Sequence, residues 1–269
     1  MKTPRLIELF NGFTSNLRFS NRFQILYNRL FRRHLPLGQY IWQNRIFFIC
    51  DNQLGDHRSV QECFCKRAYD PLLDRCQFPA NRVSYVNIGA NIGAFDLLLH
   101  ERGLRIESGL AVELNPLTCA RCQVNLQANH LSATQVVNAG IAGTLGFVMF
   151  HPGRLTIGDN IYFRTRADGN GDDGVRVQLL TLESLLEKHG RNQSYQLLKL
   201  DCEQAEYEII RLSPMEVLKR FRFIIVEFHP APAGESIPAA YGKLREAGFH
   251  SLRSETESIP FTDLFTNGD

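Results

Sequence analysis

The sequence predicts an α/β fold in which helices cover both faces of a mainly parallel sheet. From Val83 onward, short apolar segments alternate with segments whose apolar residues recur at helical spacing. Such alternation is typical of parallel strands joined by crossover helices. The length of 269 residues, with 44% hydrophobic and 22% charged residues, suits one large domain with a smaller attachment.

Three segments follow one another along the chain. Residues 1–38 are expected to form a basic, amphipathic helical extension. Residues 39–80 are expected to form a β-hairpin and a helix that lead into the core. Residues 81–269 are expected to form the main domain, with a β-hairpin insertion at about 143–177.

The extension is predicted to contain one amphipathic helix over residues 19–31. Its apolar residues fall at positions 19, 23, 26, 27, 30 and 31, with arginines between them, which is the spacing of one helix face. Pro36 and Gly38 end this helix. The apolar face is expected to dock on the protein's own domain or on a second subunit, so a homo-oligomer is one open alternative.

The connecting segment begins with residues rich in β-forming side chains. Residues 40–50 are predicted to form a hairpin with Asn44 and Arg45 at its tip. A helix is expected over about residues 58–75.

The main domain contains five predicted strands and the helices between them. The strands cover Val83–Ile88, Leu110–Val112, Thr134–Val137, Tyr195–Leu200 and Phe223–Val226, and the helices cover Ala94–Glu101, about 13 residues from Pro116, Ala205–Leu212 and Tyr241–Ala247. Between Gly143 and Val177 the alternation of strands and helices is interrupted. Two β-like segments, 146–150 and 160–165, precede a polar loop at 167–174, which predicts a hairpin with a mobile tip, for which a lid is one interpretation.

Composition excludes several classes of protein. The 20 glycines and 11 prolines are near average, which argues against collagen-like and disordered chains. No apolar stretch is long enough to cross a membrane, and the short apolar run near Met1 is too polar for a secretory signal. The seven cysteines, an odd number, lack the paired spacing of a structural zinc site and predict reduced thiols. We expect a cytoplasmic protein.

Positive charge is concentrated at the N-terminus. Residues 1–34 carry seven Lys or Arg and one Glu, whereas the whole chain has a net charge of +2. One interpretation is a solvated helix face packed on the main domain. The alternative is contact with an anionic membrane surface or nucleic acid. Because the rest of the chain has no basic patch, nucleic acid is the less favoured partner.

Polar residues follow every predicted strand of the main domain. In an open parallel sheet, ligands bind outside the carboxyl ends of the strands. These ends carry Asn87 with Gly89–Gly93, Glu113 with Asn115, Asn138, Asp201 with Glu203, and Glu227 with His229. Structural turns alone would favour Gly, Asn, Asp and Pro without carboxylates at three of five ends. The pattern therefore predicts a ligand site.

The first two strand ends indicate the kind of ligand. Gly89-x-x-x-Gly93 permits close approach to the backbone and opens a helix, but it lacks the G-x-G-x-x-G spacing of dinucleotide sites. Glu113 lies where a carboxylate accepts hydrogen bonds from ribose hydroxyls. S-adenosylmethionine (SAM) fits, with its ribose at Glu113 and its methionine carboxylate at the N–H groups after Gly89. The alternative is that Glu113 caps the helix that starts at Pro116.

Five motifs resemble those of the FkbM-type SAM-dependent methyltransferases. They are V-N-I-G-A-N-I-G-A-F (86–95), V-E-L-N-P (112–116), N-A-G-I (138–141), L-L-K-L-D-C-E-Q-A-E-Y-E-I (197–209) and I-V-E-F-H (225–229). Their order and spacing agree over roughly residues 40–250. The resemblance implies a class I, Rossmann-like methyltransferase fold and O-methylation of a hydroxyl on a small metabolite or glycan.

The resemblance also implies roles for the strand-end residues. The residues expected around the cofactor are Asn87, Gly89, Ala90, Asn91 and Gly93 at the methionine moiety, Glu113 with Asn115 at the ribose, and Asn138 and Ala139 at the adenine. The amide of Asn138 can accept from the adenine amino group and donate to a ring nitrogen, although a plain turn role is an equal alternative. Asp201 and Glu203 are expected to face the methyl group and the acceptor.

The chain departs from the family pattern at two positions. The family usually has an acidic residue at the position of Asn87 and glycine at the position of Gln204. Asn87 adds no negative charge near the cofactor ammonium. An alternative function is therefore a catalytically weakened binding protein on a methyltransferase fold. A third is an RNA- or membrane-associated methyltransferase steered by the basic N-terminus.

Methyl transfer to an alcohol requires alignment of the oxygen with the methyl group, and it gains from a base. His229 and Glu227 are the candidate bases, with Asp201 orienting or assisting. Alternatively, His229 is an ordinary residue before a proline, or Asp201, Glu227 and His229 bind a divalent metal, which is less favoured. Lys199, inside a buried strand, is predicted to pair with Glu203 or Glu206.

Overall fold

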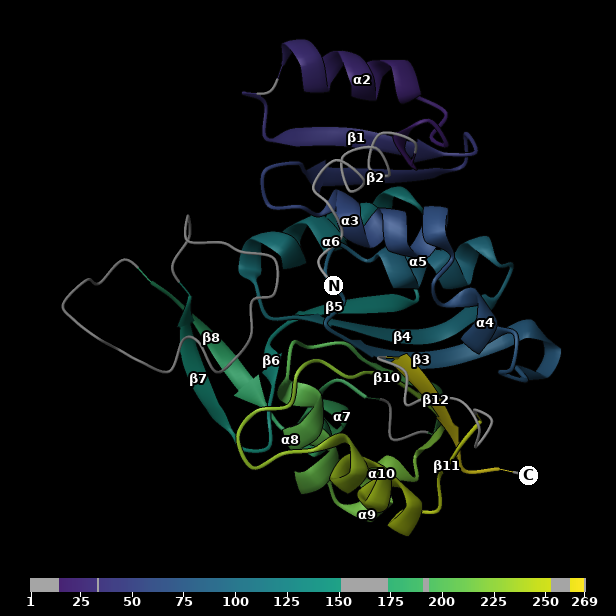
Figure 1. The fold of residues 1–269 in the computed structure, drawn as a ribbon, viewed down its shortest axis with the longest axis vertical. Coiled ribbons are helices and arrows are strands. Elements are labelled where there is room, and N and C mark those ends of the chain that lie inside the picture. The colour runs from purple at the N-terminus through teal and green to yellow at the C-terminus, as the bar shows by residue number, and fades with distance from the viewer. Residues whose placement is uncertain (1–14, 33, 151–173, 191–193, 253–261, 269) are drawn as a thin grey trace.

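The computed structural model describes residues 15–32, 34–150, 174–190, 194–252 and 262–268 (Figure 1). Its centre is a seven-stranded sheet in the order β11-β12-β10-β9-β3-β4-β5. The strands are β3 (Arg82–Ile88), β4 (Arg105–Glu113), β5 (Thr134–Asn138), β9 (Tyr195–Leu200), β10 (Phe221–Glu227), β11 (His250–Ser251) and β12 (Thr262–Thr266). The first five are parallel to one another, and β12 is antiparallel to β10. The predicted, mainly parallel sheet is confirmed.

The strand order reverses between β3 and β9. From β3 the chain proceeds outward to β4 and β5, then returns to β9 on the other side of β3. In register, Ile88 at the end of β3 lies opposite Leu200 of β9 and Val112 of β4. A crevice forms at the carboxyl ends of strands where the order reverses, so this point positions the site.

Helices cover both faces of the sheet (Figure 1). On one face lie α5 (Ala94–Glu101) and α6 (Pro116–Ala128), and on the other lie α7 (Leu182–Lys188), α8 (Ala205–Leu212), α9 (Met215–Leu218) and α10 (Ile237–Glu246). Successive strand residues point to opposite faces. Tyr85 and Leu197 accordingly belong to one apolar cluster, whereas Val86 and Leu198 belong to the other. None of the described helices is both long and apolar enough to cross a lipid bilayer.

The N-terminal extension packs on the α5/α6 side of the sheet (Figure 1). It contains α2 (Arg22–Phe31) and an antiparallel hairpin of β1 (Leu37–Trp42) and β2 (Ile46–Asp51). The turn between the strands contains Asn44 and Arg45, as predicted. Phe19 holds α2 on the hairpin through edge-to-face contacts with Tyr40 and Trp42, at ring-centroid distances of 5.2 and 5.8 Å.

Two asparagines, Asn125 on α6 and Asn129 at the C-terminal cap of α6, bind the free edge of β2. Asn129 donates to the carbonyl of Phe47 and accepts from its N–H, at 2.7 and 2.9 Å. Asn125 exchanges the same pair of bonds with Ile49 and also donates to the carbonyl of Ile92 at 3.0 Å. Residues four apart share a helix face, so this pair substitutes for a neighbouring strand. The hairpin is thereby fixed to the loop that follows β3.

The helix expected over residues 58–75 is interrupted. The structure has α3 (His57–Val60), a π-helical segment η1 (Gln61–Lys66) and α4 (Asp70–Leu73). Arg67 adopts a left-handed conformation with φ 56°, and Pro71 near the start of α4 lacks the N–H that a continuous helix would need. These two positions divide the expected helix into shorter helical segments.

The insertion is a small sheet in the order β6-β8-β7. It consists of β6 (Gly140–Ile141), β7 (Gly146–Phe150) and β8 (Val175–Leu180), with β7 antiparallel to β8. The sequence did not predict β8, which pairs with β7 in the described part of the chain. The predicted β-like segment 160–165 and almost all of the polar loop at 167–174 lie outside the described residues.

Asn87 belongs to a buried polar network beneath β3. Its side-chain amide donates to Asp96 on α5 at 2.8 Å, and Tyr85 donates to the other carboxylate oxygen at 2.7 Å. Burial raises the pKa of Asp96, although both hydrogen bonds oppose the increase. Asn87 is fully buried on this face, which corrects its expected place beside the cofactor. An acidic residue at position 87 would meet another carboxylate here.

Replacing Asn87 with Asp tests this network. We expect a loss of about 3 kcal/mol in unfolding free energy at pH 8 because two buried carboxylates oppose each other's charge. The loss should be smaller at pH 5, where a protonated carboxyl can donate in place of the amide. The folded protein holds that proton more tightly than the unfolded chain, so stability decreases as pH rises. Urea unfolding at both pH values measures this. Asn44→Asp at the exposed hairpin tip is the control, and a pH-independent loss would contradict the prediction.

Candidate active site

A cavity of about 220 Å³ opens at the carboxyl ends of the parallel strands. It is lined by most of the residues predicted from the strand ends: Gly89, Asn91, Glu113, Asn115, Ala139, Asp201, Glu203, Glu227 and His229. The other wall comes from α3 and η1, which supply Arg58, Ser59 and Glu62. Four predicted residues, Asn87, Ala90, Gly93 and Asn138, do not line it.

The loop after β3 lies directly against the end of β9. The Asp201 N–H donates to the carbonyl of Ile88 at 3.1 Å. Gly89 has φ +80°, and a Cβ at this position would overlap the carbonyl oxygen of Asp201. Glycine is therefore required here both for its conformation and for the absence of a side chain.

Every backbone N–H from Gly89 to Gly93 already has an acceptor within the protein. Gly89 and Ala90 donate to Val112 O at 3.0 and 2.9 Å, Asn91 to Glu113 Oε2 at 2.8 Å, Ile92 to Asn91 Oδ1 at 2.8 Å, and Gly93 to Ala90 O at 2.9 Å. The expectation that these groups hold the methionine carboxylate is therefore corrected. A carboxylate needs a different partner in this cavity.

Glu113 links the two loops that follow β3 and β4. Its carboxylate oxygens accept from the N–H groups of Asn91 and Asn115, both at 2.8 Å. A carboxylate is also the group that accepts hydrogen bonds from ribose hydroxyls at such strand ends, and Glu113 lines the cavity. The α6 cap is Asn115, whose side chain accepts from the N–H groups of Leu117 and Thr118. This corrects the alternative that Glu113 caps α6.

Asn138 stabilises the neighbouring strand ends. Its side-chain amide donates to the carbonyls of Glu113 and Leu114 at 2.9 and 3.0 Å. Both donors are thus already used, which corrects the expectation that this amide donates to an adenine nitrogen. Ala139, the next residue, does line the cavity.

Lys199 pairs with Asp201, which corrects the predicted pairing with Glu203 or Glu206. Its Nζ lies 2.7 Å from Asp201 Oδ2 and 5.2 Å from the centre of the Tyr69 ring. Burial lowers the pKa of this lysine, but the charge of Asp201 and the hydrogen bond to it outweigh burial and raise it. Residues two apart on a strand share a face, and this explains the choice of Asp201.

A cluster of acidic groups surrounds this ammonium. Tyr69 donates to Glu227 Oε2 at 3.0 Å and lies 3.4 Å from Asp201 Oδ2. Burial and the charge of Asp201 raise the pKa of Glu227, and the same two causes raise that of Glu62. The floor of the cavity therefore carries more negative than positive groups and favours a cationic ligand.

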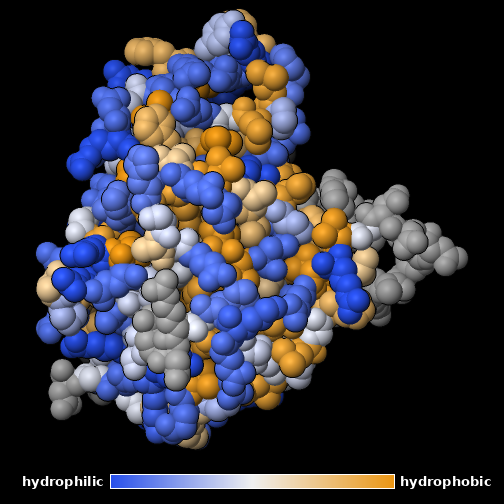
Figure 2. All heavy atoms as spheres, turned by 180° about the vertical axis from the view of Figure 1, so that it is seen from behind, coloured by the Kyte–Doolittle hydropathy of each residue, from blue (hydrophilic) through white to orange (hydrophobic). Residues whose placement is uncertain are grey.

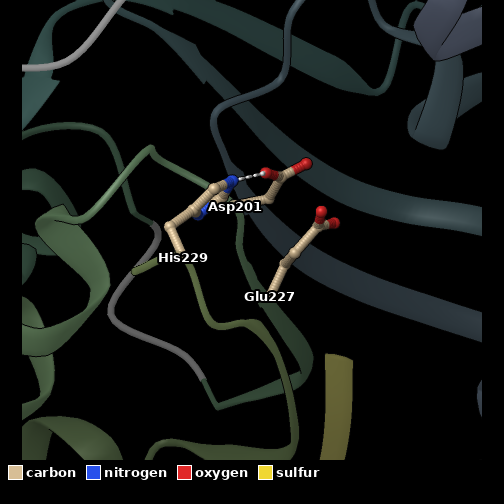
Figure 3. Close-up of side chains that lie close together, drawn as sticks. All are labelled: Asp201, Glu227 and His229. Atoms are coloured by element: carbon tan, nitrogen blue, oxygen red, sulfur yellow. Dashed lines mark ion pairs between the residues drawn. The ribbon is translucent and has the colours of Figure 1, made fainter. Parts of the chain in front are cut away.

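His229 is held in a defined orientation by Glu206, which is fully buried. Glu206 Oε1 lies 3.2 Å from His229 Nδ1 and accepts from the His229 N–H at 2.9 Å. Tyr207 donates to the carbonyl of His229 at 2.6 Å. The other ring nitrogen, Nε2, lies 3.8 Å from Asp201 and 3.5 Å from Glu203 (Figure 3). One ring nitrogen is thus anchored, and the other is available at the cavity.

The surroundings of His229 favour its charged form. Burial lowers its pKa, but the hydrogen bond to Glu206 and the charges of Glu206, Glu203 and Asp201 together raise the pKa to about 9. At pH 7 the imidazole is therefore mostly protonated. A positive ligand charge nearby would lower this pKa and favour release of the proton.

Asp201, Glu227 and His229 are close enough to share a divalent cation. One potential ligand atom from each lies within 4.8 Å of the others (Figure 3). Two carboxylates and an imidazole suit Mg, Mn or Fe. A metal would have to displace the proton of His229 and compete with Lys199 for Asp201. These three residues fit a metal only after that exchange.

Sequence reasoning missed three residues that shape the cavity. Glu206 and Tyr69 position the His229 ring and the Glu227 carboxylate, and Arg58 lines the wall. Glu206 lies within the motif at 197–209, so the resemblance to the family could have indicated it. Tyr69 and Arg58 lie outside the strand–helix pattern, so only the packing of α3, η1 and α4 against the sheet shows their position.

The loop after β9 is conformationally unusual. Glu203 and Gln204 both have positive φ, at 52° and 82°. Non-glycine residues rarely adopt this region, and they cluster at functional sites. Glycine, which the FkbM-type family usually has at the position of Gln204, would adopt this conformation more easily.

Comparison with known families and structures places the chain. A family model described as the methyltransferase FkbM domain matches residues 87–251. No curated protein matches the chain. The FkbM methyltransferase of Methylobacillus flagellatus is 13% identical with a TM-score of 0.48, and the alignment covers 69% of this chain and 44% of that one. The present chain thus spans less than half the length of that relative.

Two further solved structures match the chain. Magnesium protoporphyrin IX methyltransferase from Synechocystis, solved with SAM, is 13% identical with a TM-score of 0.41, covering 78% of this chain and 80% of that one. M. capricolum TrmK, solved with S-adenosylhomocysteine, is 10% identical with a TM-score of 0.40, covering 74% and 66%.

The family match extends over more than half of the chain. It includes the loop after β3, the ends of β4 and β9, and His229. The strand order around these ends is that of the class I, Rossmann-like fold. The chain belongs to the FkbM methyltransferase domain family.

Proposed function

We propose that the protein transfers the methyl group of SAM to a hydroxyl oxygen of a small metabolite or glycan. The observation that supports this most directly is the environment of His229, whose Nδ1 is anchored by buried Glu206 while Nε2 faces the cavity. An alcohol is a weak nucleophile until its proton is removed. A fixed imidazole at the end of β10 is suited to accept that proton.

The residues of the cavity fit the parts of SAM. Glu113 places a carboxylate in the cavity at the position suited to the ribose hydroxyls, and Ala139 and Leu114 offer apolar surface for the adenine. The acidic floor suits the ammonium and the sulfonium. Bound SAM supplies an electrophilic methyl group. Because the loop N–H groups are occupied, we assign the methionine carboxylate to Arg58 on α3.

Arg58 is suited to this role by its charge. It is the one Arg or Lys among the described residues that line the cavity. Within the described part of the chain, no hydrogen bond or ion pair engages its guanidinium. Ser59, the next residue, lies 3.3 Å from Asn91 Oδ1, which places α3 against the loop after β3. A guanidinium there can bind a carboxylate through two parallel hydrogen bonds.

The chain's own groups then perform three tasks during transfer. The neutral Nε2 of His229 accepts the hydroxyl proton as the oxygen attacks. Asp201 and Glu203 stabilise the resulting imidazolium, because both lie within 4 Å of that nitrogen. Glu206 holds the ring so that the base keeps its orientation. No step requires a metal.

Titration of His229 tests its environment without knowledge of the acceptor. We expect NMR of histidine-labelled protein to give a midpoint at about pH 9. In Glu206→Gln the midpoint should fall by about one to two pH units, because the charge that raises the pKa is removed. SAM should lower the wild-type midpoint more than S-adenosylhomocysteine, which lacks the sulfonium charge.

Glu216→Gln, on an exposed side chain, is the matched control for this titration and should leave the midpoint unchanged. An equal midpoint in wild type and Glu206→Gln would exclude the positioning role of Glu206.

Methyl transfer is tested with radiolabelled SAM and a panel of sugars and hydroxylated metabolites, after EDTA treatment. His229→Asn should reduce turnover about 10²–10⁴-fold, while S-adenosylhomocysteine affinity stays within a few-fold of wild type. Turnover that requires added Mg²⁺ would favour the metal alternative. Cofactor binding without turnover on any acceptor would favour the binding-protein alternative.

Calorimetry with two cofactor fragments tests Arg58. We expect Arg58→Ala to weaken S-adenosylhomocysteine binding about 10–100-fold, the range of a charge-assisted hydrogen-bonded pair. Binding of 5′-methylthioadenosine, which lacks the carboxylate, should not change. Arg245→Ala, at an exposed position on α10, is the control. An equal loss for both ligands would contradict the assignment, whereas no binding of either ligand to wild type would contradict SAM as cofactor.

A further inference from the structure

The outer face of α2 is apolar and uncovered. Phe23, Leu30 and Phe31 have exposed fractions of 73, 62 and 69%, and Tyr27 is half exposed. Positions three and four apart share a helix face, so the four side chains form one ridge. Ile25, on the opposite side, is the buried residue of α2. The sequence left open whether this apolar face docks on the protein's own domain or on a second subunit, and within the described residues these four side chains are not covered by the protein's own domain.

The ridge lies at the end of the molecule farthest from α9 and α10 (Figure 1). Seen from the opposite side, that end shows hydrophobic side chains among hydrophilic ones (Figure 2). Large exposed aromatic residues in one patch are unusual on a soluble surface and mark an interaction site. The patch is remote from the cavity, so it is a separate feature from the proposed methyl transfer.

The segment that carries the ridge has basic side chains and no acidic ones. No Asp or Glu occurs between Glu8 and Asp51. Arg22 and Arg32 on the helix stack over Phe23 and Tyr27, with guanidinium-to-ring distances of 5.1 and 5.5 Å. Cations therefore lie at the level of the aromatic rings, on the same surface.

We propose that α2 docks on the surface of an anionic lipid bilayer, with Phe23, Tyr27, Leu30 and Phe31 inserted among the headgroups. An interfacial helix of this kind combines an apolar face with flanking Arg or Lys residues that attract anionic lipids. A second copy of the chain is a poorer occupant, because it would bring two acid-free, arginine-bearing faces together. The surface charge of an anionic bilayer complements this face.

Vesicle sedimentation with the full chain tests the proposal. Wild-type protein should bind phosphatidylglycerol–phosphatidylcholine vesicles and not pure phosphatidylcholine, and binding should weaken as salt increases. Phe23→Ser with Phe31→Ser should reduce binding at least tenfold. Arg22→Gln with Arg32→Gln should remove the preference for anionic lipid. Val124→Ser, at an exposed apolar position on α6, should bind as wild type does.

Three results would overturn the proposal. The first is wild-type protein that remains in the supernatant with anionic vesicles at low salt. The second is unchanged binding by the Phe23/Phe31 variant. The third is a dimer in analytical ultracentrifugation that the same variant dissociates, which would show a second copy as the occupant. Thermal unfolding of each variant checks that it is folded, and S-adenosylhomocysteine binding, measured separately, keeps this test independent of the proposed function.

Discussion

The close approach of Gly89 to the carbonyl of Asp201 is the constraint on which the cavity depends. It brings the loop after β3 against the end of β9, at the point where strand order reverses. Glu113 then fixes the same loop to the end of β4 through the N–H of Asn91. Two strands on either side of β3 thus contribute carboxylates to one small space. Any side chain at position 89 would separate them.

The electrostatics of the site follow from this crowding. Several carboxylates within one cavity oppose one another's charge, and Lys199 compensates part of it at Asp201. Burial and the charge of Asp201 raise the pKa of Glu227 and of Glu62, whereas the charge of Lys199 lowers both. The hydrogen bond to Glu206 and the charges of Glu206, Glu203 and Asp201 outweigh the effect of burial on the pKa of His229, so its ring is protonated at neutral pH. A site of this kind holds a cation more readily than a neutral ligand, and the cation in turn makes a base available.

The sheet and most of the cavity lining could be predicted from the sequence, because parallel strands bring their carboxyl ends to one edge of the sheet whatever the details of packing. The direction in which each side chain points could not be predicted from the sequence. Asn87 and Glu113 both stand at strand ends, but Asn87 points beneath the sheet to Asp96. Lys199 pairs with Asp201 because residues two apart in extended backbone point to the same face. The helix expected over residues 58–75 is divided at Arg67 and Pro71, and neither this division nor the strand β8 was predicted. Glu206 and Tyr69 act through residues distant in sequence, and only coordinates bring these partners together.

The asparagine pair on α6 has a consequence for how the protein can be divided. Asn125 contacts both the edge of β2 and the carbonyl of Ile92, and α3 and η1 supply one wall of the cavity. A fragment that starts at Arg82 would retain the seven strands but leave these amides facing nothing and the ligand pocket open on one side. The hairpin of β1 and β2, together with α3 and η1, is therefore an integral part of the fold and of the cavity rather than a detachable appendage.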